Sequence, residues 1–327
     1  MHLFILKRLL IAPFLLAIFS VIAFVLIQAP PGDFLTSYIA ELAQGGTSIG
    51  QEQIEALRQQ YGLDRPTYVQ YFVWVGNLLQ GDLGTSFEWR RSNAELIGER
   101  LALTLTMTTI SLIFTWAIAI PAGIISAVRQ YSGIDYVITV LNYIGLATPN
   151  FLLALLIMWF AFDQFGVTVT GLFSPEYVAA PWSLARVADM MSRIWLPALV
   201  LAVAGTAEVA RVVRANLLDE LDRPYTEMAR AKGLPEWRLV LKYPTRVAIA
   251  PVISTLGWYI PRLLSGGLVV SVVMSLPTIG PLLLRSLIGQ DMYLAGTIIL
   301  LYSVLTIVGT LLSDILLALL DPRIRTA

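Results

Sequence analysis

Long apolar runs alternate with polar segments along the whole chain. The first run ends at Ile27, and each later run is separated from the next by residues that include charged side chains. A helix rises about 1.5 Å per residue, so a run of about 20 residues crosses the roughly 30 Å hydrocarbon layer of a membrane. The pattern predicts an all-α membrane protein with six spanning helices, at Leu9–Ile27, Leu101–Val128, Tyr136–Phe162, Ile194–Val213, Val247–Met274 and Leu294–Leu319.

The first apolar run directly follows Lys7 and Arg8. A cleaved signal peptide is the alternative interpretation, but its apolar core is typically only about 7–15 residues long and leads to a small-residue cleavage site. Leu9–Ile27 is longer, and the prolines that follow it make a poor cleavage site. We therefore expect residues 1–29 to form an uncleaved transmembrane helix.

Residues 30–99 differ in kind, because no stretch in them is apolar for long enough to span a membrane. Gln51–Gln60 predicts a short helix, and Pro66–Leu79 predicts another, opened by a proline that suits the first helical position. We expect an extracytoplasmic insertion over residues 30–99, followed by a core transmembrane domain over residues 100–327.

Prolines and polar residues interrupt the later spans. Pro149 is expected to kink the third helix, where Asn150 either satisfies the freed backbone carbonyl or lines a route for solute. Arg262 lies at membrane depth, where an unpaired charge is costly, so it faces protein or water, or snorkels outward. The candidates for a residue on a translocation route are Asn150, Arg262, Ser265 and Ser271.

Three charged residues lie on one face of the fourth predicted span near its inner end. Glu208, Arg211 and Arg214 follow one another at i, i+3 and i+6. Residues three or four apart are neighbours on a helix surface, so we expect an interfacial salt bridge here.

A polar, basic segment over residues 219–246 separates the fourth and fifth spans. Tyr225–Lys232 is rich in helix formers and is interrupted by Gly233, after which a second helix is expected to start at Pro235 or Glu236. Only glycine enters left-handed backbone conformations without steric cost. The segment therefore predicts two short helices joined by a sharp bend; a plain basic loop at the membrane surface is the alternative.

Positive charges indicate the orientation. Lysines and arginines concentrate in the segments that six spans would place on one side, including Lys7, Arg8, Arg129 and the segment 219–246. The positive-inside rule places that side, and both chain termini, in the cytoplasm.

Composition and missing motifs exclude several classes of function. Of the residues, 57% are hydrophobic and 13% charged, against roughly 25% charged in soluble domains. The formal net charge is zero, which favours no nucleic-acid partner, and the chain has no cysteine and one histidine. No phosphate-binding G-x-x-x-x-G-K-[ST] loop, nucleophile–histidine pair or dense acidic cluster occurs. We expect neither an enzyme nor a metal or cofactor site.

The basic segment carries a family resemblance. Glu227, Ala229 and Gly233 have the spacing of the E-A-A-x-x-x-G loop of binding-protein-dependent ABC importer permeases. Met228 replaces the first alanine, and the later I-x-L-P part is absent. Four short sequences resemble the oligopeptide/dipeptide permease branch. They are A-R-A-K-G-L at Ala229–Leu234, the ending D-P-R-I-R, and Y-G-L-D-R-P and G-D-L-G-T-S-F in the insertion. The chain is thereby identified as similar to the B-type subunit of that branch.

The resemblance implies a type I ABC importer permease fold in a bacterial inner membrane. It implies a homologous second permease, two ATPase subunits that bind ATP and magnesium, and an extracytoplasmic solute-binding protein facing the insertion. Glu227 would hold the shape of the loop by capping or pairing, and Ala229 would allow close packing into a groove on the ATPase. The expected ATPase-coupling residues are Tyr225, Glu227, Met228, Ala229, Ala231, Lys232, Gly233 and Leu234.

Several alternatives stay open. The same branch carries di- and oligopeptides, which we favour, but also oligosaccharides, opine-like solutes and nickel chelates. Ser271 departs from the acidic residue that peptide permeases commonly show near this point. A transporter driven by an ion gradient would need carboxylates within the membrane, and a scaffold subunit would not need a kinked fifth helix bearing Arg262.

Overall fold

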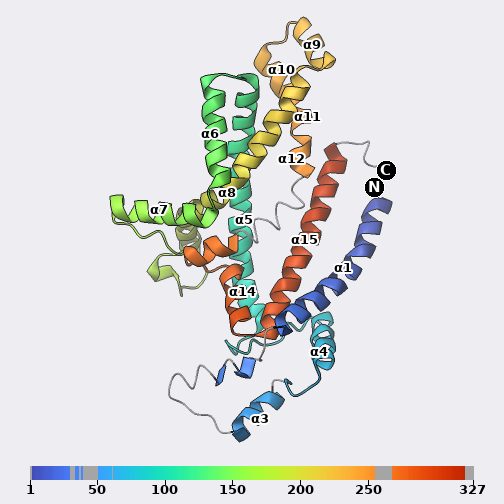
Figure 1. Ribbon diagram of the computed structural model, residues 1–327, viewed down its shortest axis with the longest axis vertical. Helices are drawn as coiled ribbons and strands as arrows, with labels where there is room; N and C mark the ends of the chain where they lie inside the picture. The colour runs from blue at the N-terminus through green and yellow to red at the C-terminus, as the bar shows by residue number, and fades with distance from the viewer. Residues whose placement is uncertain are drawn as a thin grey trace. The chain divides into compact units, whose positions relative to one another are not determined.

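The structure, a computed structural model, describes residues 2–29, 34–36, 38–39, 51–60, 62–254 and 267–320. Their regular structure is helical apart from one isolated β-bridge between Thr85 and Ser92 (Figure 1). The elements are α1 (His2–Gln28), α3 (Gln51–Gln60), α4 (Thr67–Leu79), α5 (Asn93–Val128), α6 (Gly133–Ala147), α7 (Asn150–Phe165), η1 (Pro175–Tyr177), α8 (Leu184–Leu221), α9 (Pro224–Ala231), α10 (Glu236–Lys242), α11 (Pro244–Ala248), α12 (Ala250–Ser254), α14 (Ile279–Ile288) and α15 (Met292–Leu320).

Four described helices are long and apolar enough to cross a membrane, and the bent pair α6–α7 would make a fifth span. The four are found in Leu10–Gln28, α5, α8 and Met292–Ile315. The predicted first span and the insertion helix Gln51–Gln60 are confirmed, whereas α5 and α8 begin earlier than predicted, at Asn93 and Leu184. The fifth predicted span, Val247–Met274, is described only at its two ends, and Arg262 and Ser265 lie outside the described residues.

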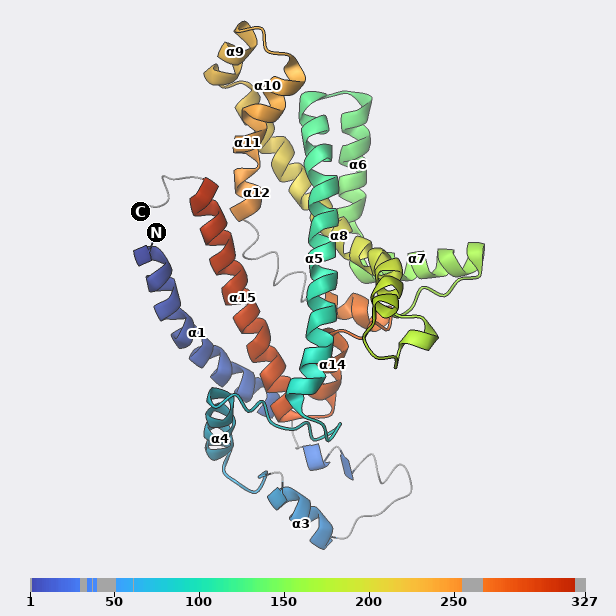
Figure 2. The ribbon, with the colours of Figure 1, turned by 180° about the vertical axis from the view of Figure 1, so that it is seen from behind.

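The third predicted span is not a single kinked helix. α6 ends at Ala147, α7 begins at Asn150, and their axes differ by 103°. Proline disfavours helical backbone at the residue before it, and Thr148 is accordingly extended, with φ −90° and ψ 118°. Pro149 is therefore the N-cap of a new helix, and α7 leaves α6 sideways (Figure 2).

The chain divides into two compact units. The core unit consists mainly of Leu105–Pro277 and Val308–Ala327, and the insertion unit consists of His2–Thr104 and Thr278–Ile307. In the core unit α8 is the central helix, because α6, α7, α11 and α12 all contact it.

Small residues bring helices of the core unit close together. A side chain at Gly123 on α5 would place its Cβ 2.7 Å from the Ala210 carbonyl oxygen and 2.8 Å from Val213 Cβ, both on α8. A Cβ at Gly145 on α6 would likewise lie 3.2 Å from Val203 Cγ1 on α8. Such contacts let backbones pack directly, which drives helix association in membranes.

In the insertion unit, Asp291 organises the connection into α15. Its Oδ1 accepts the Leu294 N–H at 3.3 Å, which is the hydrogen bond of a helix N-cap. Its Oδ2 accepts the Ser86 hydroxyl and the Glu88 N–H. One carboxylate therefore both begins α15 and holds the loop that follows α4.

A threonine joins two other helices of this unit. The Thr104 hydroxyl donates to the Arg100 carbonyl at 2.7 Å and accepts the Ile279 N–H at 3.0 Å. It satisfies one of the four N–H groups that α14 leaves unpaired at its start. Thr115 likewise donates to the carbonyl four residues back, that of Ser111, at 2.9 Å, as threonines in membrane helices commonly do.

Replacing Gly123 with alanine should destabilise the protein, although alanine is ordinarily the better helix former. The new Cβ requires backbone movement between α5 and α8, and overpacking typically costs about 1–3 kcal/mol. Gly98 on the same helix is the matched control, because nothing lies within 4 Å of its Cβ position. Gly98→Ala should gain roughly 0.5–1 kcal/mol. Melting temperatures in identical lipid nanodiscs would test this, and an equal upward shift in both variants would contradict the close contact.

Candidate functional site

The basic segment folds as two short helices around a glycine. α9 begins at Pro224, its C-cap is Lys232, and α10 follows from Glu236. Gly233 has φ +77°, in the left-handed region, and nothing lies within 4 Å of its Cβ position. Glycine is therefore needed for the backbone conformation and not for space. The predicted pair of helices with a bend at Gly233 is confirmed.

The inner face of this coupling segment, α9 to α10, packs against its own chain. Ala229 is 6% exposed and belongs to a buried cluster with Leu217 of α8 and Leu239 of α10. Leu234 packs against the same cluster from the bend. Thr226 is fully buried, and its hydroxyl donates to the Glu220 carbonyl at 2.9 Å. The Ala229 side chain is thus largely covered within the chain, and little of it is left for a partner.

The outer face of the coupling segment is different. Met228 on α9 and Trp237 on α10 are 61% and 62% exposed, and Leu241 is also exposed. Ala231 and Lys232 lie on the surface beside them. Large apolar side chains that gather on a surface between charged residues are typical of protein-binding sites.

Polar contacts hold the bend and the start of α9. Arg230 of α9 donates to both carboxylate oxygens of Glu236, at 2.7 and 3.2 Å, and holds the pKa of that carboxyl below its usual range. The Tyr225 hydroxyl donates to Glu220, and burial followed by that carboxylate raises the pKa of Tyr225 to about 12.

Glu227 does not make the contact expected of it. It lies exposed in the first turn of α9, where a negative charge suits the positive end of the helix dipole. Among the described residues no group donates a hydrogen bond to its carboxylate. Its negative charge contributes to the raised pKa of Arg230, which lies one turn further along α9. Glu236 of α10, which sequence reasoning missed, is the carboxylate that closes the bend.

An ion pair with a buried carboxylate joins helices of the core unit. Arg214 of α8 donates to both oxygens of Asp135 at 3.0 and 2.9 Å, and the Asp135 side chain is 5% exposed. The hydroxyl of Ser126 on α5 also donates to Asp135, and the Tyr131 N–H donates at 2.9 Å. The cluster therefore joins α5, α6 and α8.

The partner of Arg214 differs from the expected one. The sequence pattern grouped Arg214 with Glu208 and Arg211 on one helix face, but the ion pair of Arg214 is with Asp135. A signal for Asp135 exists in the sequence, because Ser132 caps α6 by accepting the Asp135 N–H. That spacing places Asp135 in the first turn, where its side chain can turn toward neighbouring helices.

The candidate translocation residues are only partly described. Asn150 is half-buried in the first turn of α7, directly after Pro149. Ser271 is 1% exposed, within a helical stretch over residues 267–273. No hydrogen bond joins Asn150 to Ser271 in the described part of the chain. Among those same residues, no group of three or more histidine or acidic side chains is placed to hold a metal ion.

Two protein-family models match the chain. Residues 119–326 match the binding-protein-dependent transport system inner membrane component. Residues 1–108 match the N-terminal part of the membrane component of the same kind of system. The match over residues 119–326 includes the coupling segment and the buried ion pair.

Relatives match over almost their full length. An oligopeptide transport system permease protein, AppB, of Bacillus subtilis is 38% identical over 324 residues, covering 98% of this chain and 99% of the relative. A glutathione transport system permease protein, GsiC, of Escherichia coli is 34% identical over 322 residues, covering 98% of both. Among solved structures, the inward-facing MetNI methionine ABC transporter matches with a TM-score of 0.55 at 18% identity, over 69% of this chain and 96% of that one.

Removing Arg214 should destabilise the core unit markedly. Arg214→Met leaves the Asp135 carboxylate buried without its cation, and breaking a buried pair in this way costs about 3–5 kcal/mol. Arg211→Met on the same helix is the control, because Arg211 is exposed and should change stability by less than about 0.5 kcal/mol. Denaturant titration in one detergent would measure both. Equal stability of the two variants would show that the ion pair does not hold the three helices.

Proposed function

Since this chain belongs to the family of inner-membrane components of binding-protein-dependent transport systems and is the permease subunit of an ABC importer, we propose that it imports short peptides, driven through the coupling segment. The fold is shared with a methionine ABC transporter, and several apolar helices of spanning length make the chain a multi-pass membrane protein.

The names of the relatives support a peptide substrate. One relative is called an oligopeptide permease and another a glutathione permease, and glutathione is itself a short peptide. Oligosaccharides, opine-like solutes and nickel chelates are the alternatives. Uptake of labelled tripeptides by the assembled importer, with a sugar and a nickel chelate as competitors, separates these classes.

The partners follow from the same membership. A homologous second permease would complete the pore, two ATPase subunits would bind the cytoplasmic loops with ATP and magnesium, and a solute-binding protein would meet the insertion of residues 30–99. The chain itself would hold no cofactor. Both termini would lie in the cytoplasm of a bacterial inner membrane, with the coupling region, residues 219–246, on the same side.

The observation that carries the coupling proposal is the two-sided coupling segment. Its inner face is tied to α8 through the Ala229 cluster, and its outer face presents exposed Met228 and Trp237. A partner that holds the outer face can therefore move the segment together with α8. Closure of the ATPase dimer would drive the movement, because nucleotide binding favours one of two conformations by differential affinity.

A substitution at Gly233 tests the coupling function separately from the assembly of the complex. Gly233→Val forces a branched residue into a left-handed conformation that costs about 1–2 kcal/mol even for simple residues. We expect the α9–α10 angle to shift and ATP-driven uptake to fall by roughly tenfold, the equivalent of 1.4 kcal/mol. Gly233→Asn is the control, because asparagine enters this region most readily among other residues.

The measurement is uptake and ATP hydrolysis by the complete complex in proteoliposomes, with subunit stoichiometry checked by gel. Hydrolysis should continue in Gly233→Val while uptake falls about tenfold. Unchanged uptake in a fully assembled Gly233→Val complex would refute the coupling role. Uptake by this chain alone, driven by an ion gradient, would favour a secondary transporter.

The two faces of α9 and α10 should respond differently to substitution. Trp237→Ala removes an exposed side chain, so the melting temperature should stay unchanged while less ATPase subunit copurifies. Ala229→Leu inserts bulk into the buried cluster and should lower stability by about 1–3 kcal/mol. Copurification and melting temperature, measured on both variants, test the division. A lower melting temperature of Trp237→Ala together with normal ATPase copurification would show that Trp237 belongs to the packed face and not to the partner-binding face.

A further inference from the structure

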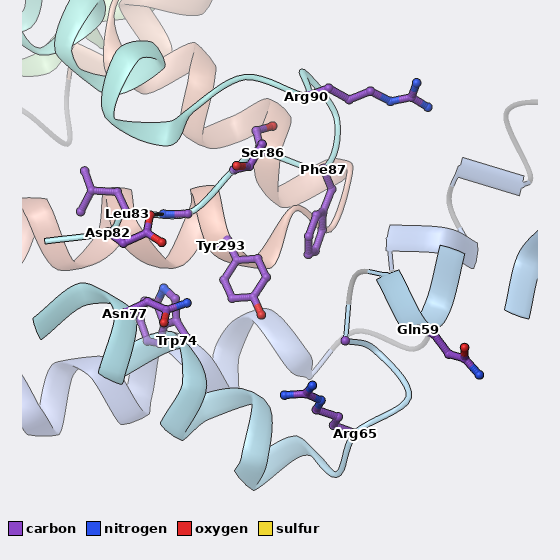
Figure 3. Close-up of a pocket in the computed structure, with 13 residues that line it drawn as sticks. Gln59, Arg65, Trp74, Asn77, Asp82, Leu83, Ser86, Phe87, Arg90 and Tyr293 are labelled. Atoms are coloured by element: carbon purple, nitrogen blue, oxygen red, sulfur yellow. Dashed lines mark hydrogen bonds between the residues drawn. The ribbon is translucent and has the colours of Figure 1, made fainter. Parts of the chain in front are cut away.

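The insertion unit contains a cavity that the coupling function does not use. Its volume is about 660 Å³, within the roughly 300–1,000 Å³ that small-molecule sites typically have. Its walls come from α4, the loop that follows it, the turn before α4, and Tyr293 at the start of α15 (Figure 3). It therefore lies wholly within one compact unit.

Opposite charges lie at different sides of this cavity. The Arg65 guanidinium points toward the space that the Tyr293 hydroxyl also faces (Figure 3). Arg90 lines the rim, and its guanidinium is directed outward, where it donates to the Tyr38 hydroxyl at 3.3 Å. No other described side chain pairs with Arg65. Asp82 lies on the other side of Tyr293, and its backbone N–H donates to the Asn77 carbonyl at 2.9 Å. Its Oδ1 accepts the Gly84 N–H at 2.8 Å, and no group of the described residues donates to its Oδ2. The cavity thus offers a cation at one end and a carboxylate at the other.

A buried aromatic ring forms part of the wall between them. Trp74 lines the cavity, is 2% exposed, and its indole N–H has no hydrogen-bond partner among the described residues. The ring is held in place, because a Cβ at Gly296 would come within 2.7 Å of it and Phe24 stacks on it. The rigid ring therefore forms a fixed part of the cavity wall.

The walls are fixed before any ligand arrives. The Ser86 hydroxyl is bonded to Asp291, and the Asn93 amide donates to the Leu83 carbonyl at 2.8 Å. Gly84 has φ +75°, so the loop takes a turn that favours glycine. Preorganised walls reduce the entropy lost when a ligand binds.

We propose that this cavity binds a short zwitterionic peptide. Arg65 and Tyr293 hold its terminal carboxylate, Asp82 holds its terminal ammonium, and the Asn77 amide bonds a peptide group between them. The site would capture cargo on the permease itself, so the inference rests on the proposed import of peptides. A zwitterionic phospholipid headgroup carries the same pair of charges, and the experiment must separate the two.

The test uses the assembled importer, without its solute-binding protein, in nanodiscs of phosphatidylglycerol, which lacks a zwitterionic headgroup. Calorimetric titration compares four probes: trialanine, trialanine amide, N-acetyl-trialanine, and the peptide blocked at both ends. Trialanine should bind best, and each block should weaken binding about tenfold or more, since a hydrogen bond to a charged group is worth about 1.5–3 kcal/mol.

Two variants should each abolish one preference. In Arg65→Gln the affinity for trialanine should fall about tenfold, and trialanine and its amide should bind equally well. The variant should still bind probes with a free amine better than acetylated ones. Asp82→Asn should do the converse. Arg91→Gln is the control and should behave as the unsubstituted chain, because Arg91 pairs with Glu95 at the surface and is not among the residues that line the cavity.

Two results would overturn the proposal. One is the absence of trialanine binding at millimolar concentration; the other is equal binding of all four probes. If phosphatidylethanolamine, added to the nanodiscs, binds at Arg65 by native mass spectrometry and trialanine does not displace it, the occupant is a lipid headgroup and the peptide site is wrong. If both variants still import peptide with ATP and bind the four probes as the unsubstituted chain does, the import function stands and only the proposed site is refuted.

Discussion

The buried pairing of Asp135 with Arg214 is the constraint on which the arrangement of the core unit depends. A carboxylate that is 5% exposed is tolerable only beside a cation and several donors, and Arg214, Ser126 and the Tyr131 N–H supply them. These groups come from α5, α6 and α8 and from the turn between α5 and α6. Because the charge must stay paired, the three helices can move together but resist moving apart, and α8 continues from this junction directly to the coupling segment.

Packing, more than charge, gives the coupling segment its shape. The Arg230–Glu236 pair across the bend is half exposed, and surface pairs of this kind contribute at most about 1 kcal/mol. Leu217 and Leu239 are completely buried in the cluster around Ala229, and burying one such side chain contributes about 1.5–3 kcal/mol. The small side chain of Ala229 thus lets α9 lie close to its own chain. The exposed apolar groups on the opposite face are what remains for another subunit to hold.

Several features were predictable because they depend on neighbouring residues. Apolar runs of sufficient length predict spanning helices, and the helix at Gln51–Gln60 was found at its predicted bounds. Gly233 could be assigned a left-handed backbone because it interrupts a run of helix formers just before a proline. The 103° angle after Pro149 could not be predicted in the same way. A proline both ends one helix and suits the start of the next, and the packing of α6 and α7 on α8 decides which occurs.

The sequence by itself determined the helical class, the membrane setting, the bend at Gly233 and, through the spacing of Glu227, Ala229 and Gly233, the family. Tertiary structure alone decided which distant groups meet. Asp135 and Arg214 are 79 residues apart, and Ser86 and Asp291 are 205 apart. A local pattern reports the conformation of the backbone around it, whereas a partner so far along the chain is selected only by the packing that excludes water and requires every buried charge or donor to be satisfied.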